Sequence, residues 1–292
     1  MAGSRYAYVR NFELPDPVLP NTYMLVRIDG KGFHRFSNDH NFTKPNDGKA
    51  LELMNEAARF VMNDLRPEIT LAFGESDEYS FLLRPSCTLY KRRSSKLVTH
   101  IVSLFTSAYV FNWSKYMDCS LQYPPSFDGR LVIYPSQKEV KDYFAWRQVD
   151  THINNLYNTT FWALVLQGNQ TEREAHETLK GTVSSDKNEI LYNRFQVNYD
   201  KLPAMFRKGT TLAWDARPEK LNEGEGAQEK KPEKVKARLR TLHVDIIGSH
   251  FWSESSKQKR EVSQLESNEQ QPWEDQDRTT DTNSLGFTAL KP

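Results

Sequence analysis

Two groups of carboxylates stand where short apolar segments end, and their type and spacing suit a divalent cation. Asp29 closes the apolar run of residues 23–28, and Asp77 and Glu78 lie in a turn that begins at Gly74, between two β-type segments. Two carboxylates a few ångströms apart repel unless a cation lies between them, and Mg²⁺ prefers one or two such oxygens plus substrate phosphates. The pattern predicts a two-metal phosphoryl-transfer site. The alternative is that Asp29 and Asp77 only cap turns.

Groups that suit a polyphosphate lie near Asp29 in the sequence. Gly30 leaves room for its carbonyl to approach a metal, and residues 31–34 offer backbone N–H groups beside it. Arg27 precedes Asp29 by two residues, so both side chains lie on the same side of their strand. Residues 44–47 (Lys-Pro-Asn-Asp) predict a further phosphate contact and, in Asp47, a helix N-cap.

A basic ridge is predicted at the start of a later helix. Positive charge at a helix N-terminus is unfavourable for the helix dipole, so a nearby anion explains the ridge better than helix stability does. An ordinary solvated face is the alternative. The ridge consists of Arg92, Arg93, Lys96 and His100.

Hydrophobic periodicity indicates which elements position these residues. It predicts strands over residues 22–29, 69–73, 79–84 and 130–134, and helices over residues 48–64, about 89–116 and about 137–168. The β-α-β-β-α-β order predicts an α+β fold, a ferredoxin-like or polymerase-palm sheet with additional helices. The first and third strands of that fold are antiparallel neighbours, so Asp29 and Asp77 are expected to lie close together.

Composition divides the 292 residues into three parts. We predict a palm-like catalytic domain over residues 5–136, a helical region over 137–215, and a polar, mostly disordered tail over 216–292. The tail is too rich in charged and small polar residues to bury the surface that ordering requires. The apolar island of residues 242–247 inside it either docks on the folded part or serves as a partner motif.

Charge and cysteine usage exclude several classes of protein. The 39 Lys plus Arg nearly balance the 38 Asp plus Glu, so no bulk charge marks a nucleic-acid binder. The two cysteines, Cys87 and Cys119, form no CxxC pair, which argues against a disulfide scaffold or a zinc module. The absence of a long apolar run or a secretory signal predicts no membrane association. A cytoplasmic location is expected, with nuclear entry through basic residues such as Lys230 and Lys231 left open.

Six separated motifs, in order between about Tyr6 and Trp214, resemble the tRNA(His) guanylyltransferase family. Such a run of motifs in register makes a chance likeness very improbable. The motifs are RIDGKGFHRF at 27–36, KPND at 44–47, SDEYSF at 76–81, KRRSSK at 91–96, FDGR at 127–130 and HINNLYNT at 152–159.

The resemblance implies an activity and a set of reactants. The family's fold is similar to a polymerase palm that runs in reverse and adds a guanosine to the 5′ end of tRNA(His), in the 3′–5′ direction. ATP activates the tRNA 5′-monophosphate, the 3′-hydroxyl of GTP attacks the adenylylated end, and pyrophosphate is then removed. Two Mg²⁺ ions are implied as cofactors, and a homotetramer or homodimer as the assembly.

The resemblance also assigns roles to residues of this chain. Asp29, the Gly30 carbonyl and Asp77 would bind metal, with Glu78 supporting the catalytic site. Nucleotide contacts are implied for Lys31, Gly32, Phe33, His34 and Ser76, and a second nucleotide site for Lys44, Asn46 and Asp47. Arg27, Arg93 and Lys96 would contact the activating triphosphate or the tRNA 5′-phosphate. The helical region would hold oligomer contacts and contacts with tRNA. The residues implied to contact tRNA are His152, Asn155, Lys187, Asn188 and Asn198.

Two other functions share part of this evidence. A palm-type nucleotidyl cyclase uses the same strand-end aspartate and acidic turn, but it needs no tRNA. A non-enzymatic RNA-binding module also fits a ferredoxin-like sheet, but it gives no reason for Asp29 and Asp77 to converge, and the strands lack the usual RNA-binding aromatic pattern. The helix motif at 152–159 and the ridge at 91–96 favour the tRNA enzyme.

Overall fold

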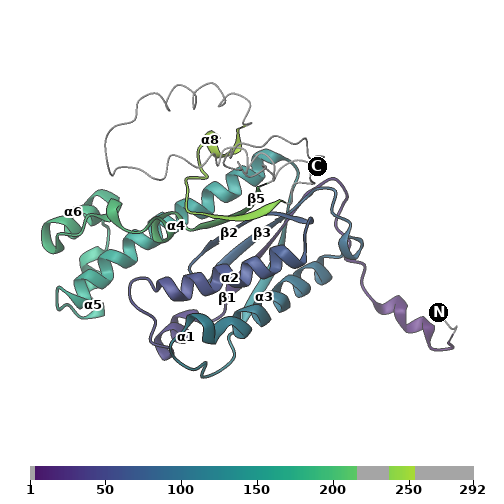
Figure 1. The fold of residues 1–292 in the computed structure, drawn as a ribbon, viewed down its shortest axis with the longest axis horizontal. Helices are drawn as coiled ribbons and strands as arrows, with labels where there is room; N and C mark the ends of the chain where they lie inside the picture. The colour runs from purple at the N-terminus through teal and green to yellow at the C-terminus, as the bar shows by residue number, and fades with distance from the viewer. Residues whose placement is uncertain (1–3, 216–236, 254–292) are drawn as a thin grey trace, which may run out of the picture.

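A six-stranded antiparallel sheet forms the centre of the molecule (Figure 1). The computed structural model describes residues 4–215 and 237–253. The strand order is β4-β1-β3-β2-β5-β6, and each neighbouring pair is antiparallel. The strands are β1 (Tyr23–Gly30), β2 (Ile69–Glu75), β3 (Glu78–Leu83), β4 (Phe127–Tyr134), β5 (Thr210–Asp215) and β6 (Arg238–Leu242).

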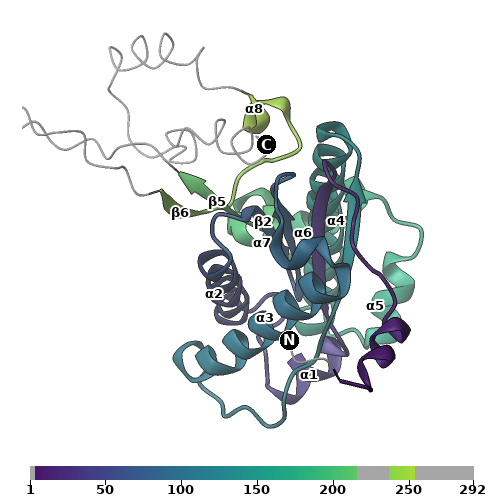
Figure 2. The ribbon, with the colours of Figure 1, turned by 90° about the vertical axis from the view of Figure 1, so that its right-hand side faces the viewer.

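Helices cover both faces of the sheet (Figure 2). Alternate side chains of a strand point to opposite faces, and in β1 this sends Val26 toward α2 (Gly48–Asp64) and α3 (Ser94–Tyr116), while Leu25 packs with residues of α4 (Gln137–Leu166). The α2 and α3 face holds the larger apolar cluster. The α4 face combines an apolar cluster with buried polar and charged side chains.

The second half of α4 extends beyond the sheet and carries a small helical lobe (Figure 1). Leu156 packs with Leu191 of α6, and Leu164 with Leu179 of α5. A capping box begins α5, since the Thr171 side chain and Glu174 satisfy each other's backbone N–H groups. The remaining helices are α1 (Phe33–Asp39), α5 (Glu172–Leu179), α6 (Ser184–Phe195), α7 (Ala204–Lys208), α8 (Ser249–Trp252), η1 (Ala7–Phe12), η2 (Leu89–Arg92) and η3 (Tyr199–Lys201). In the described part of the chain, none of them combines the length and apolar character needed to cross a bilayer.

The predicted fold class is confirmed, and one helix boundary is wrong. The strands β1 and β3 are antiparallel neighbours, and β2 and β3 form the expected hairpin. The predicted helix over 89–116 begins instead at Ser94, after η2. Tyr90, Lys91 and Arg92 all have positive φ values, which an α-helix does not accommodate. The backbone turns there because the Arg92 side chain is held by carbonyl groups of neighbouring loops.

The folded part of the chain extends beyond residue 215, so the predicted tail is corrected between residues 238 and 252. Strand β6 pairs with β5, and Ile246, Phe251 and Trp252 are buried on the α4 face. The apolar island therefore docks. The Gln148 side chain satisfies the docked backbone by donating to the Val244 carbonyl at 2.9 Å and accepting from the Ile246 N–H at 2.8 Å. Residues 216–236 and 254–292 lie outside the described residues.

Candidate active site

The two predicted metal-binding aspartates lie together at one end of the sheet. Asp29 stands opposite Glu78 in the register of β1 and β3. The turn between β2 and β3 folds back on β1, so that the Gly30 N–H donates to the Asp77 carbonyl at 3.1 Å. Ser76 adopts a left-handed φ of 48° in this turn, and its hydroxyl donates to the Asp77 carboxylate at 2.9 Å. Strand pairing and the tight turn thus bring both carboxylates to one place.

This place concentrates negative charge in a partly buried environment. Burial raises the pKa of Asp77, and the charge of Asp29 raises it further. Burial also raises the pKa of Glu78, although the cationic Arg147 and Arg27 beside it oppose the shift. Carboxyls whose charged forms are disfavoured by burial and by one another gain from a bound cation. The electrostatics suit a divalent metal.

The donor set fits Mg²⁺. Asp29 and Asp77 supply carboxylate oxygens, and Gly30 supplies a backbone carbonyl. A Cβ atom at position 30 would lie 2.3 Å from the Phe33 ring, which is a collision. Only glycine therefore allows this backbone to lie so close to the ring. No group of three or more His, Cys, Asp or Glu side chains gathers as a metal site in residues 4–215 and 237–253. Two carboxylates and a carbonyl are nevertheless enough for Mg²⁺, which is commonly held by one or two carboxylates plus substrate phosphates.

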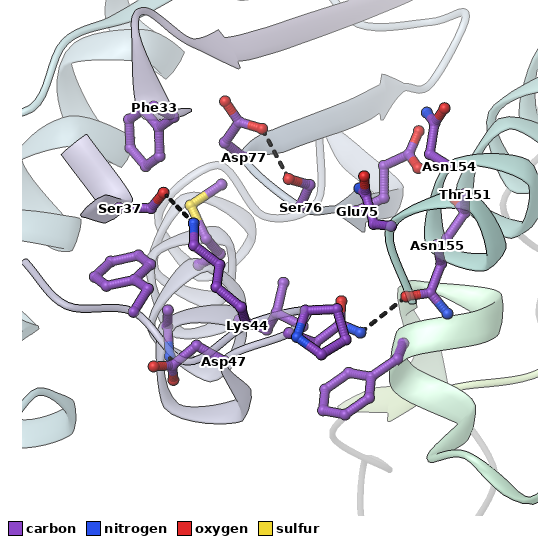
Figure 3. A pocket seen from close by; sticks show the side chains of 18 of the residues that line it. Phe33, Ser37, Lys44, Asp47, Glu75, Ser76, Asp77, Thr151, Asn154 and Asn155 are labelled. Carbon is purple, nitrogen blue, oxygen red and sulfur yellow. Dashed lines mark hydrogen bonds between the residues drawn. The ribbon is translucent and has the colours of Figure 1, made fainter. Parts of the chain in front are cut away.

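The turn at residues 75–78, here called the acidic turn, borders a cavity of about 600 Å³ that opens between the loop before α2 and the face of α4 (Figure 3). Its volume is in the range of small-molecule sites. Asp29 and Gly30 do not line it. The buried Tyr109 hydroxyl does line it, and it has no hydrogen-bond partner among the described residues. Of the predicted nucleotide contacts, the cavity brings together Phe33, His34, Lys44, Asn46, Asp47, Ser76 and Asp77.

The loop before α2 supplies a cation and two hydrogen-bonding side chains to the cavity. Lys44 donates to the Ser37 hydroxyl at 3.0 Å and lies 5.6 Å from the centre of the Trp162 ring, and burial lowers its pKa. Asn46 donates to Asn155 of α4 at 2.9 Å. Asp47 is the predicted N-cap of α2, accepting from the N–H groups of residues 49 and 50. Lys31 and Gly32 form the exposed turn that leads into α1.

The predicted phosphate-binding cations do not all lie at this site. Arg27 faces α4, and its Nε is 3.7 Å from Glu78 Oε2. Arg93 pairs with Asp16 at 2.8 Å, and Lys96 is exposed near the Tyr90 ring. Burial raises the pKa of Tyr109 on α3, and the nearby charge of Asp77 raises it further, so Tyr109 marks the part of α3 that lies near the carboxylates. Lys96 is about 20 Å from Tyr109 along the same helix. Within one chain, therefore, Arg93 and Lys96 are separated from the carboxylates.

Arg92 does not belong to a basic ridge, which corrects the sequence interpretation. Its side chain is buried and donates to five backbone carbonyls and one hydroxyl. A guanidinium so fully engaged has no donors left for a phosphate. The acceptors belong to Val18, Leu19, Thr22, Pro85 and Cys87.

The predicted tRNA contacts lie around the second half of α4. His152 is exposed, and its ring packs 5.4 Å from the Tyr199 ring. Asn155 is buried between Asn46 and Tyr199, donating to the Tyr199 hydroxyl at 3.0 Å. Lys187 donates to the Thr182 carbonyl, Asn188 to the Ser184 carbonyl, and Asn198 caps η3. Asn155 thus lies in the cavity wall, whereas the others lie on the helical lobe or beside it.

Sequence reasoning missed Glu75 and Arg147. Burial raises the pKa of Glu75 to about 7, although a hydrogen bond from Thr151 and the charge of Arg147 oppose the rise. Arg147, only 5% exposed, joins α4 to the acidic turn. A signal was present in the sequence, because Tyr143, Arg147, Thr151 and Asn155 recur at spacing four and so share one helix face.

The fold and the site define a class. An antiparallel sheet whose adjoining central strands deliver two carboxylates beside a cavity of nucleotide size is the arrangement of palm-type nucleotidyltransferases. Comparison with protein families agrees with this class. The tRNAHis guanylyltransferase model matches residues 6–135, and the Thg1 C terminal domain model matches residues 138–248. The chain belongs to the tRNA(His) guanylyltransferase family.

Individual relatives agree over most of the chain. It is 52% identical over 256 residues to a tRNA(His) guanylyltransferase of Schizosaccharomyces pombe, covering 87% of this chain and 96% of the relative. It is 50% identical over 257 residues to a probable tRNA(His) guanylyltransferase of Drosophila melanogaster, covering 88% and 85%.

Solved structures agree in fold. The crystal structure of the Saccharomyces cerevisiae tRNA(His) guanylyltransferase superposes with a TM-score of 0.69 at 48% identity, covering 72% of this chain and 93% of that one. A bacterial Thg1-like protein in complex with ATP has a TM-score of 0.62 at 23% identity, covering 88% and 95%, and it supports the fold alone.

Proposed function

We propose that this chain is a tRNA(His) guanylyltransferase that adds one guanosine to the 5′ end of its tRNA. The reaction joins the tRNA 5′-phosphate to AMP from ATP with release of pyrophosphate. The 3′-hydroxyl of GTP then displaces AMP, and pyrophosphate is removed from the new end. The observation that carries the proposal is the convergence of Asp29 and Asp77 beside a cavity of about 600 Å³.

Two Mg²⁺ ions would be held by Asp29, the Gly30 carbonyl and Asp77, and they would supply charge neutralisation to the reacting phosphates. The protein's own groups orient the reactants. Lys44 contributes a positive charge to the cavity lining, where its ammonium group donates to the Ser37 hydroxyl (Figure 3). Phosphoryl transfer depends mainly on such positioning and on charge stabilisation, so no covalent nucleophile of the protein is needed.

The remaining assignments follow the family resemblance. ATP and GTP are the proposed nucleotide substrates, and His152, Lys187 and Asn198 are proposed to contact tRNA on the helical lobe. Arg27, Arg93 and Lys96 are proposed to bind phosphate. Arg93 and Lys96 are separated from the carboxylates of their own chain, so they would contact a tRNA 5′ end that is bound at the carboxylates of another copy. This arrangement is consistent with the predicted homodimer or homotetramer. Light scattering of the purified protein tests the assembly, and cell fractionation tests the cytoplasmic location.

Transfer of labelled GTP to 5′-monophosphorylated tRNA(His) in the presence of ATP and Mg²⁺ tests the activity. We expect Asp77→Asn to lower the rate by about 100-fold or more, because charge stabilisation at the reacting phosphates is usually the largest catalytic term. Asp118→Asn is the matched control, since Asp118 is exposed and pairs with Lys49. Near-normal transfer by Asp77→Asn would remove the metal assignment. A cyclase would give a cyclic nucleotide without tRNA, and a binding module would give no labelled product.

A further inference from the structure

One face of α4 carries a ladder of buried polar side chains that contact successive parts of the site. Residues 143, 147, 151 and 155 are all at most 6% exposed. The Tyr143 hydroxyl is 2.7 Å from the Ser80 hydroxyl on β3, and Asn155 accepts from Asn46 beside the nucleotide cavity. Arg147 and Thr151, between them, reach the acidic turn. Figure 3 shows Thr151 and Asn155 of this ladder beside Glu75.

Arg147 contacts the carboxylates on both sides of the turn. Its Nη2 donates to Glu75 Oε1 at 3.1 Å, and its Nε lies 3.0 Å from Glu78 Oε1. The same Nη2 donates to Asp150 at 2.6 Å, and the guanidinium lies 4.1 Å above the Trp146 ring. One planar cation therefore connects the last residue of β2 with the first residue of β3.

These two residues flank the proposed metal ligand. Ser76 and Asp77 are the two residues between Glu75 and Glu78, so a cation that holds both glutamates also fixes the turn that carries Asp77. The Asp77 carbonyl accepts from the Gly30 N–H, and the Asp77 carboxylate accepts from the Ser76 hydroxyl of the same turn. A shift of the glutamates would change the position of the Asp77 carboxylate relative to Asp29.

We propose that Arg147 is a positioning residue for the metal site, a proposal that rests on the proposed function. It holds Glu75 and Glu78 so that Asp77 and Asp29 present their oxygens to the same cations, and it links this geometry to α4. Residues that orient metal ligands without touching the metal commonly change metal affinity by 10- to 100-fold when they are replaced. A lysine cannot replace Arg147, because an ammonium group lacks the planar fork that reaches several carboxylates at once.

The test measures cation binding directly. Binding of Mn²⁺, which favours the same oxygen ligands as Mg²⁺, is followed by electron paramagnetic resonance without nucleotide or tRNA. We expect Arg147→Lys and Arg147→Met to weaken Mn²⁺ binding by about 10-fold or more. In the transfer assay, the Mg²⁺ concentration for half-maximal rate should rise in the same variants while KM for tRNA stays unchanged.

Arg59→Met is the matched control. Arg59 also bridges two carboxylates, Glu52 and Glu56, but it lies on α2 away from the acidic turn. Wild-type Mn²⁺ affinity in both Arg147 variants, or an equal loss in Arg59→Met, would overturn the inference. Failure of both Arg147 variants to fold would assign Arg147 to stability and would also overturn it.

The proposed function is tested separately by Asp77→Asn in the same titration. If Asp77→Asn loses Mn²⁺ and Arg147→Met does not, the positioning role of Arg147 is wrong and the metal assignment stands. If the wild-type chain binds no Mn²⁺, the metal assignment itself fails, and the inference fails with it.

Discussion

The guanidinium groups of Arg92 and Arg147 are buried to a similar extent but contact different kinds of oxygen. Arg92 is 8% exposed and donates to backbone carbonyls of two loops and to the Thr22 hydroxyl. Arg147 is 5% exposed and contacts three carboxylates, two of which flank the acidic turn. Burial of an arginine therefore does not by itself indicate a functional site, and the chemical nature of the partners distinguishes the two.

The difference separates a role in stability from a role in chemistry. The carbonyl acceptors of Arg92 hold the chain before β1 against the chain after β3, and they carry no net charge that would respond to a ligand. The carboxylates around Arg147 adjoin the oxygens that are proposed to bind metal. Changes at Arg92 should act through folding, and changes on the α4 face should act first on the site.

The largest expected effect on stability is that of Arg92→Met. The change removes the donor to two buried carbonyls, those of Val18 and Cys87, and to several partly buried acceptors. Each buried carbonyl left without a donor costs about 1–3 kcal/mol, so we expect the free energy of unfolding to fall by about 3 kcal/mol. Urea denaturation measures the loss. Arg84→Met is the control, because Arg84 makes a partly exposed ion pair with Glu68 that should contribute less than about 1 kcal/mol. Equal losses in the two variants would contradict the stability role.

Asn155→Ala should act mainly on nucleotide binding. Asn155 accepts from Asn46 in the cavity wall and donates to Tyr199, so its loss should free the loop before α2. Loss of about 1.4 kcal/mol of hydrogen bonding would raise KM for nucleotide about 10-fold. Steady-state kinetics with each substrate varied in turn check the result. A rise in KM for tRNA alone would instead support the direct tRNA contact implied by the family resemblance.

Tyr143→Phe probes the end of the α4 ladder that lies away from the loop before α2. The change removes the buried hydrogen bond to Ser80 and should lower the free energy of unfolding by about 1 kcal/mol. Because neither hydroxyl touches the acidic turn, the Mg²⁺ dependence of the rate should not change. A double-mutant cycle with Ser80→Ala measures the coupling, and an altered Mg²⁺ dependence would show that the ladder acts as one unit.

The smallest expected effect is at Asp16, which pairs with Arg93, the residue next to Arg92 in the chain. Hydrogen bonds from Ser95 and Arg93 hold the pKa of Asp16 well below its usual range. Its folded pKa is depressed, so its stabilisation is present above the ordinary carboxyl pKa and is lost as the pH falls through the folded value. Asp16→Asn should therefore lower the melting temperature slightly near neutral pH, and the difference from wild type should shrink in acid. A difference that grows in acid would contradict this sign.

The sheet and its carboxylates could be predicted because they depend on local pattern and on one topological rule. The apolar run of β1 and the helical spacing in α2 are visible in short windows, and the β-α-β-β-α-β order then makes β1 and β3 neighbours. That adjacency placed Asp29 beside Asp77. The N-cap role of Asp47 was predictable for the same reason, because its partners are two and three residues away.

The remaining features depend on contacts between distant residues. The backbone at Arg92 departs from a helix because carbonyls about 70 residues earlier hold its side chain. The pairing of β6 with β5 and the ion pairs of Arg147 with Glu75 likewise join distant segments. The arginine and lysine ridge looked continuous in the sequence, yet it divides into a buried anchor, an ion-paired Arg93 and an exposed Lys96.

The late strand β6 and the turn of helix α8 have a practical consequence for anyone shortening this protein. A version ending at residue 215 would leave β5 as an open edge, and unpaired edges recruit other chains. It would also strip Trp252 from beside the Phe144 ring, where the two centroids are 6.1 Å apart, and leave the Gln148 amide without two of its backbone partners. A fragment intended for crystallisation should therefore retain the chain through Ser253.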